Sequence, residues 1–267
     1  MPLTNLIVLA LIQGLTEFLP ISSSGHLIIV PNLISWQDQG LIIDVAVHAG
    51  SLLAVIIYLW RDLWHIIAAL IDFRNLQQSP DLKLAKLIII GSIPVVMMGL
   101  IISLISDNLT RNIEIIAWAT LAFGILLGIS DKIGLAVSDL RHMTIGDAIL
   151  IGISQALALI PGASRAGLTI TMARFLGYDR KTAARFSLLL AIPAILGAST
   201  LKSAELIETN NLILGIDVLI AATVSFLAAL ASISIMMAWL NRVGFMPFVI
   251  YRIILGIALL IWVYFLS

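Results

Sequence analysis

The stretch Pro20-Ile21-Ser22-Ser23-Ser24-Gly25 interrupts an apolar run that extends from residue 3 to residue 35. Proline ends the preceding helix and has no amide hydrogen to donate, so this run does not read as one straight helix. A second apolar run, residues 144–176, is broken in the same way by Pro161-Gly162-Ala163-Ser164. Each run therefore predicts a helix, a polar loop and a second helix.

The composition around these two loops indicates a membrane protein. Of the 267 residues, 61% are apolar and only 11% are Asp, Glu, Lys or Arg, which is less than half the charged share of a soluble domain. The 15 basic and 15 acidic residues balance, which argues against nucleic acid as a partner. The sequence has no cysteine, which excludes disulfides and thiol chemistry.

Six further stretches reach the roughly 20 apolar residues that a membrane span needs. They are, approximately, residues 41–60, 84–106, 112–130, 182–202, 212–240 and 246–266. We therefore expect an all-α polytopic membrane protein with six transmembrane helices plus two re-entrant helix-loop-helix pairs. Non-helical backbone at membrane depth persists only where protein shields it or where it lines a wet cavity. The two loops are thus the first places to look for a functional site.

The two halves of the chain resemble each other. Gln13…Pro20-x-x-Ser23 recurs as Gln155…Pro161-x-x-Ser164, and Ser51-Leu-Leu-Ala-Val recurs as Ser187-Leu-Leu-Leu-Ala-Ile. Each half holds one re-entrant pair and three spans, and an odd number of crossings inverts the second half. We expect a single integral membrane domain, residues 1–267, made of repeat 1 (about 1–130) and inverted repeat 2 (about 131–267).

Basic residues are distributed unevenly between the two sides of this topology. One side collects Arg61, Arg74, Lys83, Lys86, Lys132, Arg141, Arg174, Arg180, Lys181, Arg185 and Arg242. The side that holds both termini collects only Arg111 and Lys202, while Arg165 and Arg252 are assigned to membrane depth. Because cytoplasmic loops carry the excess of Lys and Arg, we expect both termini to lie outside the cell.

Six ionisable residues fall within the apolar layer: Glu17, His26, Asp44, His48, Arg165 and Arg252. A charge at that depth costs at least about 2.5–3.5 kcal/mol on insertion scales, so each residue is a functional candidate. Asp44 and His48 are four residues apart at the entry of a span, which favours a local pair. Arg252 is interpreted as pairing or snorkelling to the interface rather than as catalytic.

The residues around the two breaks suit a phosphate group with a divalent cation. Gln13 and Glu17 are four residues apart and share one helix face, where they offer hard oxygen ligands. In the other loop Ser164 and Arg165 occupy a helix start, where free amides and the helix dipole favour an anion. Two structural interpretations compete: Glu17 and Arg165 form an ion pair only, and the serines only cap helices and join spans.

The chain resembles a known family at these residues. The segment Gln13-Gly14-Leu15-Thr16-Glu17-Phe18-Leu19-Pro20-Ile21-Ser22-Ser23-Ser24-Gly25-His26 is similar to the Glu/Gln-x-x-x-Glu signature of bacterial undecaprenyl-diphosphate phosphatases, the bacitracin-resistance proteins. The segment Pro161-Gly162-Ala163-Ser164-Arg165-Ala166-Gly167-Leu168-Thr169 is similar to their Pro-Gly-x-Ser-Arg-Ser-x-x-Thr signature. Residues 44–51 and 245–252 also look familial, so the resemblance covers nearly the whole chain.

The resemblance implies a multi-pass hydrolase of the bacterial cytoplasmic (inner) membrane, with a site accessible from the outer face. Such an enzyme hydrolyses undecaprenyl diphosphate to undecaprenyl phosphate and inorganic phosphate, which recycles the lipid carrier for cell-wall synthesis. The resemblance also implies a divalent cation, Mg or Ca. It further implies resistance to bacitracin, which competes for the polyprenyl diphosphate substrate.

Roles follow as hypotheses for individual residues. Arg165 clamps phosphate oxygens, because its planar fork donates two parallel hydrogen bonds. Glu17 holds the metal, alone or with Gln13, or acts as general base. His26 transfers a proton or attacks phosphorus, and Ser23 is the competing nucleophile, so the nucleophile stays open among Ser23, His26 and an activated water. The remaining substrate-binding candidates are Ser22, Ser24, Gly162, Ser164 and Thr169.

The sequence departs from the family signatures at two positions. Ala166 stands where the second serine of Ser-Arg-Ser is expected, so that hydroxyl is dispensable or is replaced by Thr169 or Ser164. Gln13 is the neutral option of the first signature, which leaves Glu17 alone in the anionic role. Two other function classes remain alternatives: a transporter or flippase of the lipid phosphate, built on the same inverted-repeat plan, and a helical scaffold without activity.

Overall fold

The structure is a computed structural model that describes residues 2–34, 36, 40–71, 79–105, 112–134, 139–208 and 215–266. Within these ranges the chain is helical and contains no strand. Two of the basic residues used to orient the chain, Arg74 and Arg111, lie outside the described residues.

Six helices are long and apolar enough to cross a membrane. They are α3 (Gly40–Tyr58), α5 (Pro80–Ile105), α6 (Ile113–Ile133), α9 (Arg180–Glu208), α10 (Ile216–Val243) and α11 (Met246–Ile261), the last of which continues as a π-helix, η4 (Trp262–Leu266). They match the six predicted spans, which confirms the prediction of an all-helical multi-pass membrane protein.

The two remaining apolar runs are broken where the prolines predict. The first forms α1 (Leu3–Thr16) and α2 (Ser23–Leu33), and the second forms α7 (Ile145–Ala156), a short 3₁₀ turn η3 (Leu157–Leu159) and α8 (Arg165–Phe175). The residues between them, 17–22 and 160–164, form non-helical loops, called loop A and loop B below. Two elements were not predicted: the amphipathic helix α4 (Trp60–Ile71) and the 3₁₀ turn η2 (Leu140–His142).

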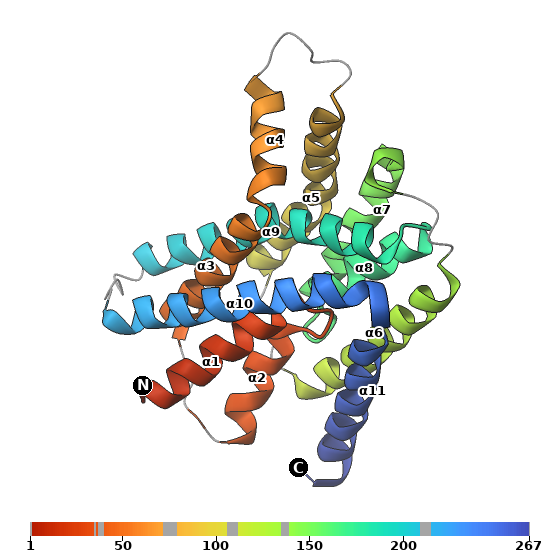
Figure 1. Cartoon of the computed structure of the whole chain (residues 1–267). Helices are drawn as coiled ribbons and strands as arrows, with labels where there is room; N and C mark the ends of the chain where they lie inside the picture. Colours follow the sequence, from red (N-terminus) through yellow and green to blue (C-terminus); the bar gives the residue numbers. More distant parts are fainter. Residues whose placement is uncertain are drawn as a thin grey trace.

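Helices from the two halves of the chain pack against one another. Helix α1 lies against α10, α7 lies against α5, and α3 packs on both α9 and α10 (Figure 1). Glycines permit the close approaches: a Cβ on Gly14 would lie 2.7 Å from the Cβ of Ala228, and one on Gly152 would lie 3.0 Å from the carbonyl carbon of Gly91. Small residues at such contacts let helix backbones approach closely in membranes.

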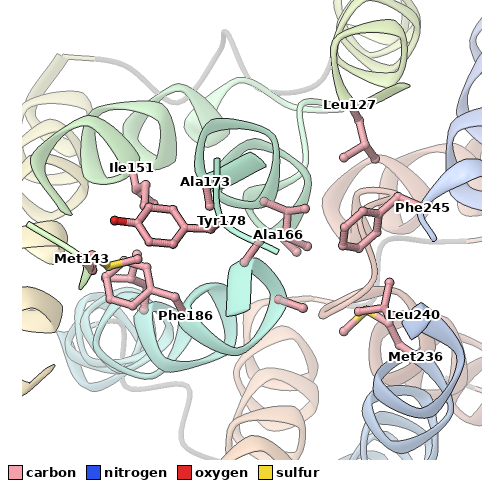
Figure 2. Packing of buried hydrophobic residues seen from close by; sticks show 14 of the residues in the cluster. Leu127, Met143, Ile151, Ala166, Ala173, Tyr178, Phe186, Met236, Leu240 and Phe245 are labelled. Carbon is pink, nitrogen blue, oxygen red and sulfur yellow. The ribbon is translucent and has the colours of Figure 1, made fainter. Parts of the chain in front are cut away.

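The largest buried apolar cluster reaches the first turn of α8, which directly follows loop B (Figure 2). Its members come from α5 to α11 and the turns between them, and the labelled ones are Leu127, Met143, Ile151, Ala166, Ala173, Tyr178, Phe186, Met236, Leu240 and Phe245. Ala166, in the first turn of α8, is buried in this cluster. The position where the family signature expects a second serine is therefore part of the apolar packing here.

Candidate active site

Loops A and B end in the same unusual backbone conformation. Ser22 has φ 74° and Ser164 has φ 71°, and these are the two non-glycine residues with positive φ in the described chain. Each serine is the N-cap of the following helix: the Ser22 Oγ accepts from the amide of Gly25, and the Ser164 Oγ accepts from the amide of Gly167. A non-glycine residue in this region is strained and is found mostly at functional sites.

Arg252 of α11 joins the two loops from within the protein. Its side chain is fully buried, and its guanidinium donates to the carbonyl of Pro20 in loop A at 3.2 Å. It also donates to the carbonyls of Gly162 and Ala163 in loop B, both at 3.0 Å. Further bonds reach the carbonyl oxygens of α6 at Thr120, 3.1 Å, and Ala119, 3.4 Å. Arg252 was expected to pair or to snorkel, and the structure shows that it pairs with backbone.

Glu17 and Arg165 meet where the loops come together. Nη2 of Arg165 lies 3.1 Å from Oε1 of Glu17, and both side chains are buried for the most part, with 14% and 8% of their surface exposed. The other carboxylate oxygen, Oε2, accepts from Ser23 Oγ at 2.6 Å and from Gln13 Nε2 at 2.9 Å. Four of the predicted site residues thus form one hydrogen-bonded group, in which Glu17 and Arg165 are 148 positions apart in the sequence, as the expectation that the loops meet requires.

Arg165 is held on its remaining sides by groups that the sequence did not single out. The guanidinium carbon lies 5.7 Å from the ring centroid of Phe18, in cation–π range. Its Nη1 lies 3.5 Å from the carbonyl oxygen of Ser187 on α9. The Ser187 hydroxyl lies 2.7 Å from the Thr169 hydroxyl, so this serine connects two predicted site residues. The sequence signal for Ser187 is its place in the internal repeat that pairs Ser51 with Ser187.

Both ring nitrogens of His26 contact protein groups. Nδ1 lies 2.6 Å from the carbonyl oxygen of Ser22, and a carbonyl can only accept, so Nδ1 carries the proton in this contact. In the neutral ring Nε2 is then the acceptor, and it receives the hydroxyl of Tyr251 at 2.5 Å. The two rings also stack, with centroids 5.7 Å apart and planes inclined by 11°. Tyr251 lies on α11 next to Arg252, and its signal in the sequence is its place in the segment 245–252 that looks familial.

The remaining predicted residues lie around this centre. Ser24 is exposed, and its hydroxyl is 3.3 Å from that of Ser22. Gly162 has φ 87°, and its carbonyl also accepts from the Thr120 hydroxyl at 3.3 Å. A Cβ at Gly162 would meet the backbone of α6, so glycine serves both the turn and the close contact.

Asp44 and His48 are joined through backbone. His48 Nδ1 contacts the carbonyl oxygen of Asp44 at 2.7 Å, and the Asp44 carboxylate lies 3.6 Å from the Lys202 ammonium. His48 also lies within electrostatic range of Glu17. The expected local pair therefore exists, and His48 belongs to the surroundings of the site.

The oxygen ligands at the centre fit a divalent cation that shares its coordination with a phosphate. Within the described chain no cluster of three or more His, Cys, Asp or Glu residues exists. However, Gln13 Oε1 is buried without a hydrogen-bond partner, while Nε2 of the same amide donates to the Glu17 carboxylate. A buried carbonyl oxygen without a partner is costly, and a cation would satisfy it. Mg²⁺ in particular is held by one or two carboxylates together with substrate phosphates and waters.

Comparison with known proteins relates this geometry to one family. The family model described as bacitracin resistance protein BacA matches residues 6–258. The chain is 49% identical over 269 residues to an undecaprenyl-diphosphatase of Jannaschia sp. (strain CCS1), a match that covers 99% of this chain and all of the relative. It is 47% identical over 262 residues to an undecaprenyl-diphosphatase of Hahella chejuensis, covering 97% of this chain and 98% of the relative.

Proposed function

Because the chain belongs to the bacitracin resistance protein BacA family, we propose that it hydrolyses undecaprenyl diphosphate to undecaprenyl phosphate and inorganic phosphate. The observation that carries the proposal is the 3.1 Å contact between Glu17 and Arg165, which unites the two loops whose sequences match the family signatures. A buried acid and a buried guanidinium beside several hydroxyls suit phosphoryl transfer, which depends mainly on positioning and charge neutralisation.

Arg165 binds the diphosphate through its guanidinium fork, and the incoming phosphate oxygens compete with Glu17 for the same donors. Phe18 and the Ser187 carbonyl hold the guanidinium in place while this exchange occurs. The exchange releases one oxygen of Glu17 as a free base. The ion pair is therefore the resting arrangement of the site.

Ser23 is the nucleophile that the geometry favours. Its hydroxyl already donates to Glu17 at 2.6 Å, so the carboxylate can take the proton while Oγ attacks the terminal phosphorus. The P–O bond to the lipid phosphate breaks, and Glu17 passes the proton to the departing undecaprenyl phosphate, which restores the carboxylate. Glu17 then deprotonates a water that attacks the phosphoserine, inorganic phosphate leaves, and the Ser23 oxygen takes the proton back from Glu17. His26 is less suited to attack because its Nε2 is covered by Tyr251.

A divalent cation, Mg²⁺ or Ca²⁺, would be held by Glu17 and by the amide oxygen of Gln13, with Ser23 as a further oxygen. When bound, it supplies positive charge that neutralises the phosphate oxygens. The donor set contains one carboxylate, so a cation would depend on the substrate for part of its coordination.

The fold proposed for this function is an inverted-topology repeat with two re-entrant pairs. Three matched features support it: Ser22 and Ser164 have the same backbone conformation and capping role, Gln13 and Gln155 are both fully buried, and α1 and α7 each pack on a span of the other half. With the positive-inside distribution of Lys and Arg, both termini lie outside a bacterial inner membrane. The site then opens to the outer face, where bacitracin competes for the same lipid.

Release of inorganic phosphate from a short-chain prenyl diphosphate in detergent tests the enzyme against the transporter and the scaffold. The wild type should release phosphate, EDTA should suppress the release, and Glu17→Gln should lose most of it. Arg165→Lys should lose on the order of 10²-fold although the charge is kept, because the planar fork is lost. Arg242→Lys, at the exposed end of α10, is the matched control and should keep its activity.

Folded wild-type protein that releases no phosphate in this assay would overturn the proposal and favour transport. Near-normal turnover by Arg165→Lys would remove the clamp from the mechanism. To identify the nucleophile, the enzyme is quenched during turnover and the phosphorylated residue is mapped. Phosphate on His26 would contradict the assignment of Ser23.

A further inference from the structure

A cavity of about 760 Å³ lies away from the reaction loops, at the start of α5. Its walls come from the first two turns of α5, the η2 turn and the second turn of α9. Its lining includes four cationic side chains and one carboxylate: Lys83, Lys86, Arg141, Arg185 and Asp81. All four cations belong to the side of the protein that collects the excess of Lys and Arg.

The contacts of the four cations leave most of their charge uncompensated. The Lys83 ammonium donates to the backbone carbonyl of Arg141 at 2.8 Å, which fixes α5 against the η2 turn. That bond leaves the ammonium charge uncompensated and two of its hydrogens free to donate. Arg185 is paired with Asp62 of α4. For Lys86 and the Arg141 guanidinium no carboxylate partner is recorded within the described part of the chain.

Three acidic residues lie in or near the cavity, and two of them are hydrogen-bonded to other groups. Asp81 lies 3.9 Å from His65, and Asp139 accepts from the Arg141 amide and contacts His142. Asp147 interacts electrostatically with Lys83, but its carboxylate accepts from the Tyr178 hydroxyl at 2.6 Å and from the Thr144 amide at 2.9 Å. Burial raises the pKa of Asp147, yet these hydrogen bonds outweigh it and lower the pKa below its usual value. The cavity therefore keeps an excess of positive charge.

Helix α4 places the cavity at the level of the lipid headgroups. It lies beside α5 (Figure 1), and its Trp60 and Trp64 are exposed, as are Ile67 and Ile71 on the same helix. Tryptophan gathers at the membrane–water interface. Through the pair of Asp62 with Arg185, this amphipathic helix is tied directly to the cavity wall. A ligand in the cavity thus has an apolar surface beside it for acyl chains.

We propose that this cavity binds a phosphate-bearing anion, and that its occupant is the headgroup of an anionic membrane lipid. Basic pockets between helices on the cytoplasmic side have the chemistry that anionic lipid headgroups require. Three cations without a carboxylate partner supply the donors, and the volume lies in the usual range for ligand pockets. Free inorganic phosphate has the same donor requirement and is the alternative source.

The test compares three forms of the purified full-length protein in detergent by native mass spectrometry with added phosphatidylglycerol or phosphatidylcholine. They are the wild type, the variant Lys83→Gln/Lys86→Gln/Arg141→Gln, and the control Lys132→Gln/Lys181→Gln/Arg242→Gln, which removes as many charges outside the cavity. The wild type should prefer phosphatidylglycerol. The cavity variant should bind it about tenfold or more weakly, and the control should stay within about twofold of the wild type.

A second arm identifies the source of the phosphate group. Inorganic phosphate is titrated in a melting experiment without lipid; a shift in the wild type that the cavity variant loses would support the anion site and assign it to free phosphate. Equal binding of phosphatidylglycerol by wild type and cavity variant would overturn the proposal, as would an equal loss in the control. If the triple variant does not fold, Lys86→Gln alone replaces it, with a few-fold weaker binding expected.

Discussion

Arg252 places a guanidinium in the interior of the protein, where its recorded partners are all backbone carbonyls. The carbonyls of Pro20 and Gly162 that it binds occupy corresponding places in loop A and loop B. A single residue from a third element thus sets the distance between the two loops. The Glu17–Arg165 contact depends on that distance, so Arg252 is a positioning residue.

Arg252→Lys should weaken the protein and its activity together, because an ammonium cannot reach five carbonyls arranged around a planar fork. Each buried carbonyl left without a partner costs about 1–3 kcal/mol. We expect a clearly lower melting temperature in detergent and a loss of phosphate release on the order of tenfold or more. A variant with wild-type stability and turnover would show that the loops are held together by other contacts.

Tyr251→Phe tests the hydrogen bond that Tyr251 of α11 makes to His26. The change keeps the ring beside His26 and removes the hydroxyl that donates to Nε2. One hydrogen bond is worth about 1 kcal/mol, so kcat should fall roughly fivefold while KM for the prenyl diphosphate changes little. His26→Gln in the same assay shows the largest effect on kcat that the His26–Tyr251 pair can have. If His26→Gln is fully active, the pair is structural, and Tyr251→Phe should leave kcat unchanged.

Part of this site is visible in the sequence and part is not. Glu17 and Arg165 are charged residues within apolar stretches of the sequence. Because a buried charge in a membrane costs free energy, such residues can be recognised as functional candidates from the sequence. Tyr251 and Ser187 are common residues on ordinary spans, and only their approach to His26 and Arg165 in space gives them a role. The charge of Arg252 makes it a candidate in the sequence. Its carbonyl partners, however, lie in loop A, loop B and α6, which no local sequence pattern connects.

At the scale of elements, proline alone does not decide where a helix ends. Pro94 lies inside α5, Pro193 inside α9 and Pro31 inside α2. By contrast, Pro20 and Pro161 are each followed by small residues and a capping serine that offer the chain another conformation. Helix α4 was missed because it has only 12 residues, which is too short for a span.

Gly152→Ala tests the contact between α7 and α5. A Cβ at this position would collide with the carbonyl oxygen of Gly91, and backbone cannot move aside as a side chain can. We expect a loss of about 1–3 kcal/mol in stability, measured as a lower melting temperature in detergent. Gly197→Ala in α9 is the control, because no atom lies within 4 Å of its added Cβ; equal effects of the two changes would contradict the close-packing explanation.

At the scale of the whole molecule, the sequence predicted the number of spans but not how they pack. Span lengths follow from hydropathy, which is a local property. The glycine contacts between α7 and α5 join residues more than 60 positions apart in the sequence. Those between α1 and α10 join residues more than 200 positions apart. Other glycines within spans look the same in the sequence, yet Gly99 in α5 and Gly197 in α9 have open space around them.

The absence of cysteine from the sequence makes the orientation directly testable. Thr4→Cys near the N-terminus should react with a membrane-impermeant maleimide in intact cells. Lys181→Cys at the start of α9 should react only after the membrane is permeabilised. The opposite pattern would reverse the assignment of the two sides, and with it the outward opening of the site.

The pairing of α1 with α10 also bears on the order in which the chain can assemble during synthesis. Gly14 fits against Ala228 and Ala229, which leave the ribosome more than two hundred residues later. The first helix and its polar turn must therefore wait in the translocon or the surrounding lipid without their final neighbour. Any factor that shelters nascent membrane helices should matter most for this segment, and a chain truncated before α10 should be removed by proteolysis.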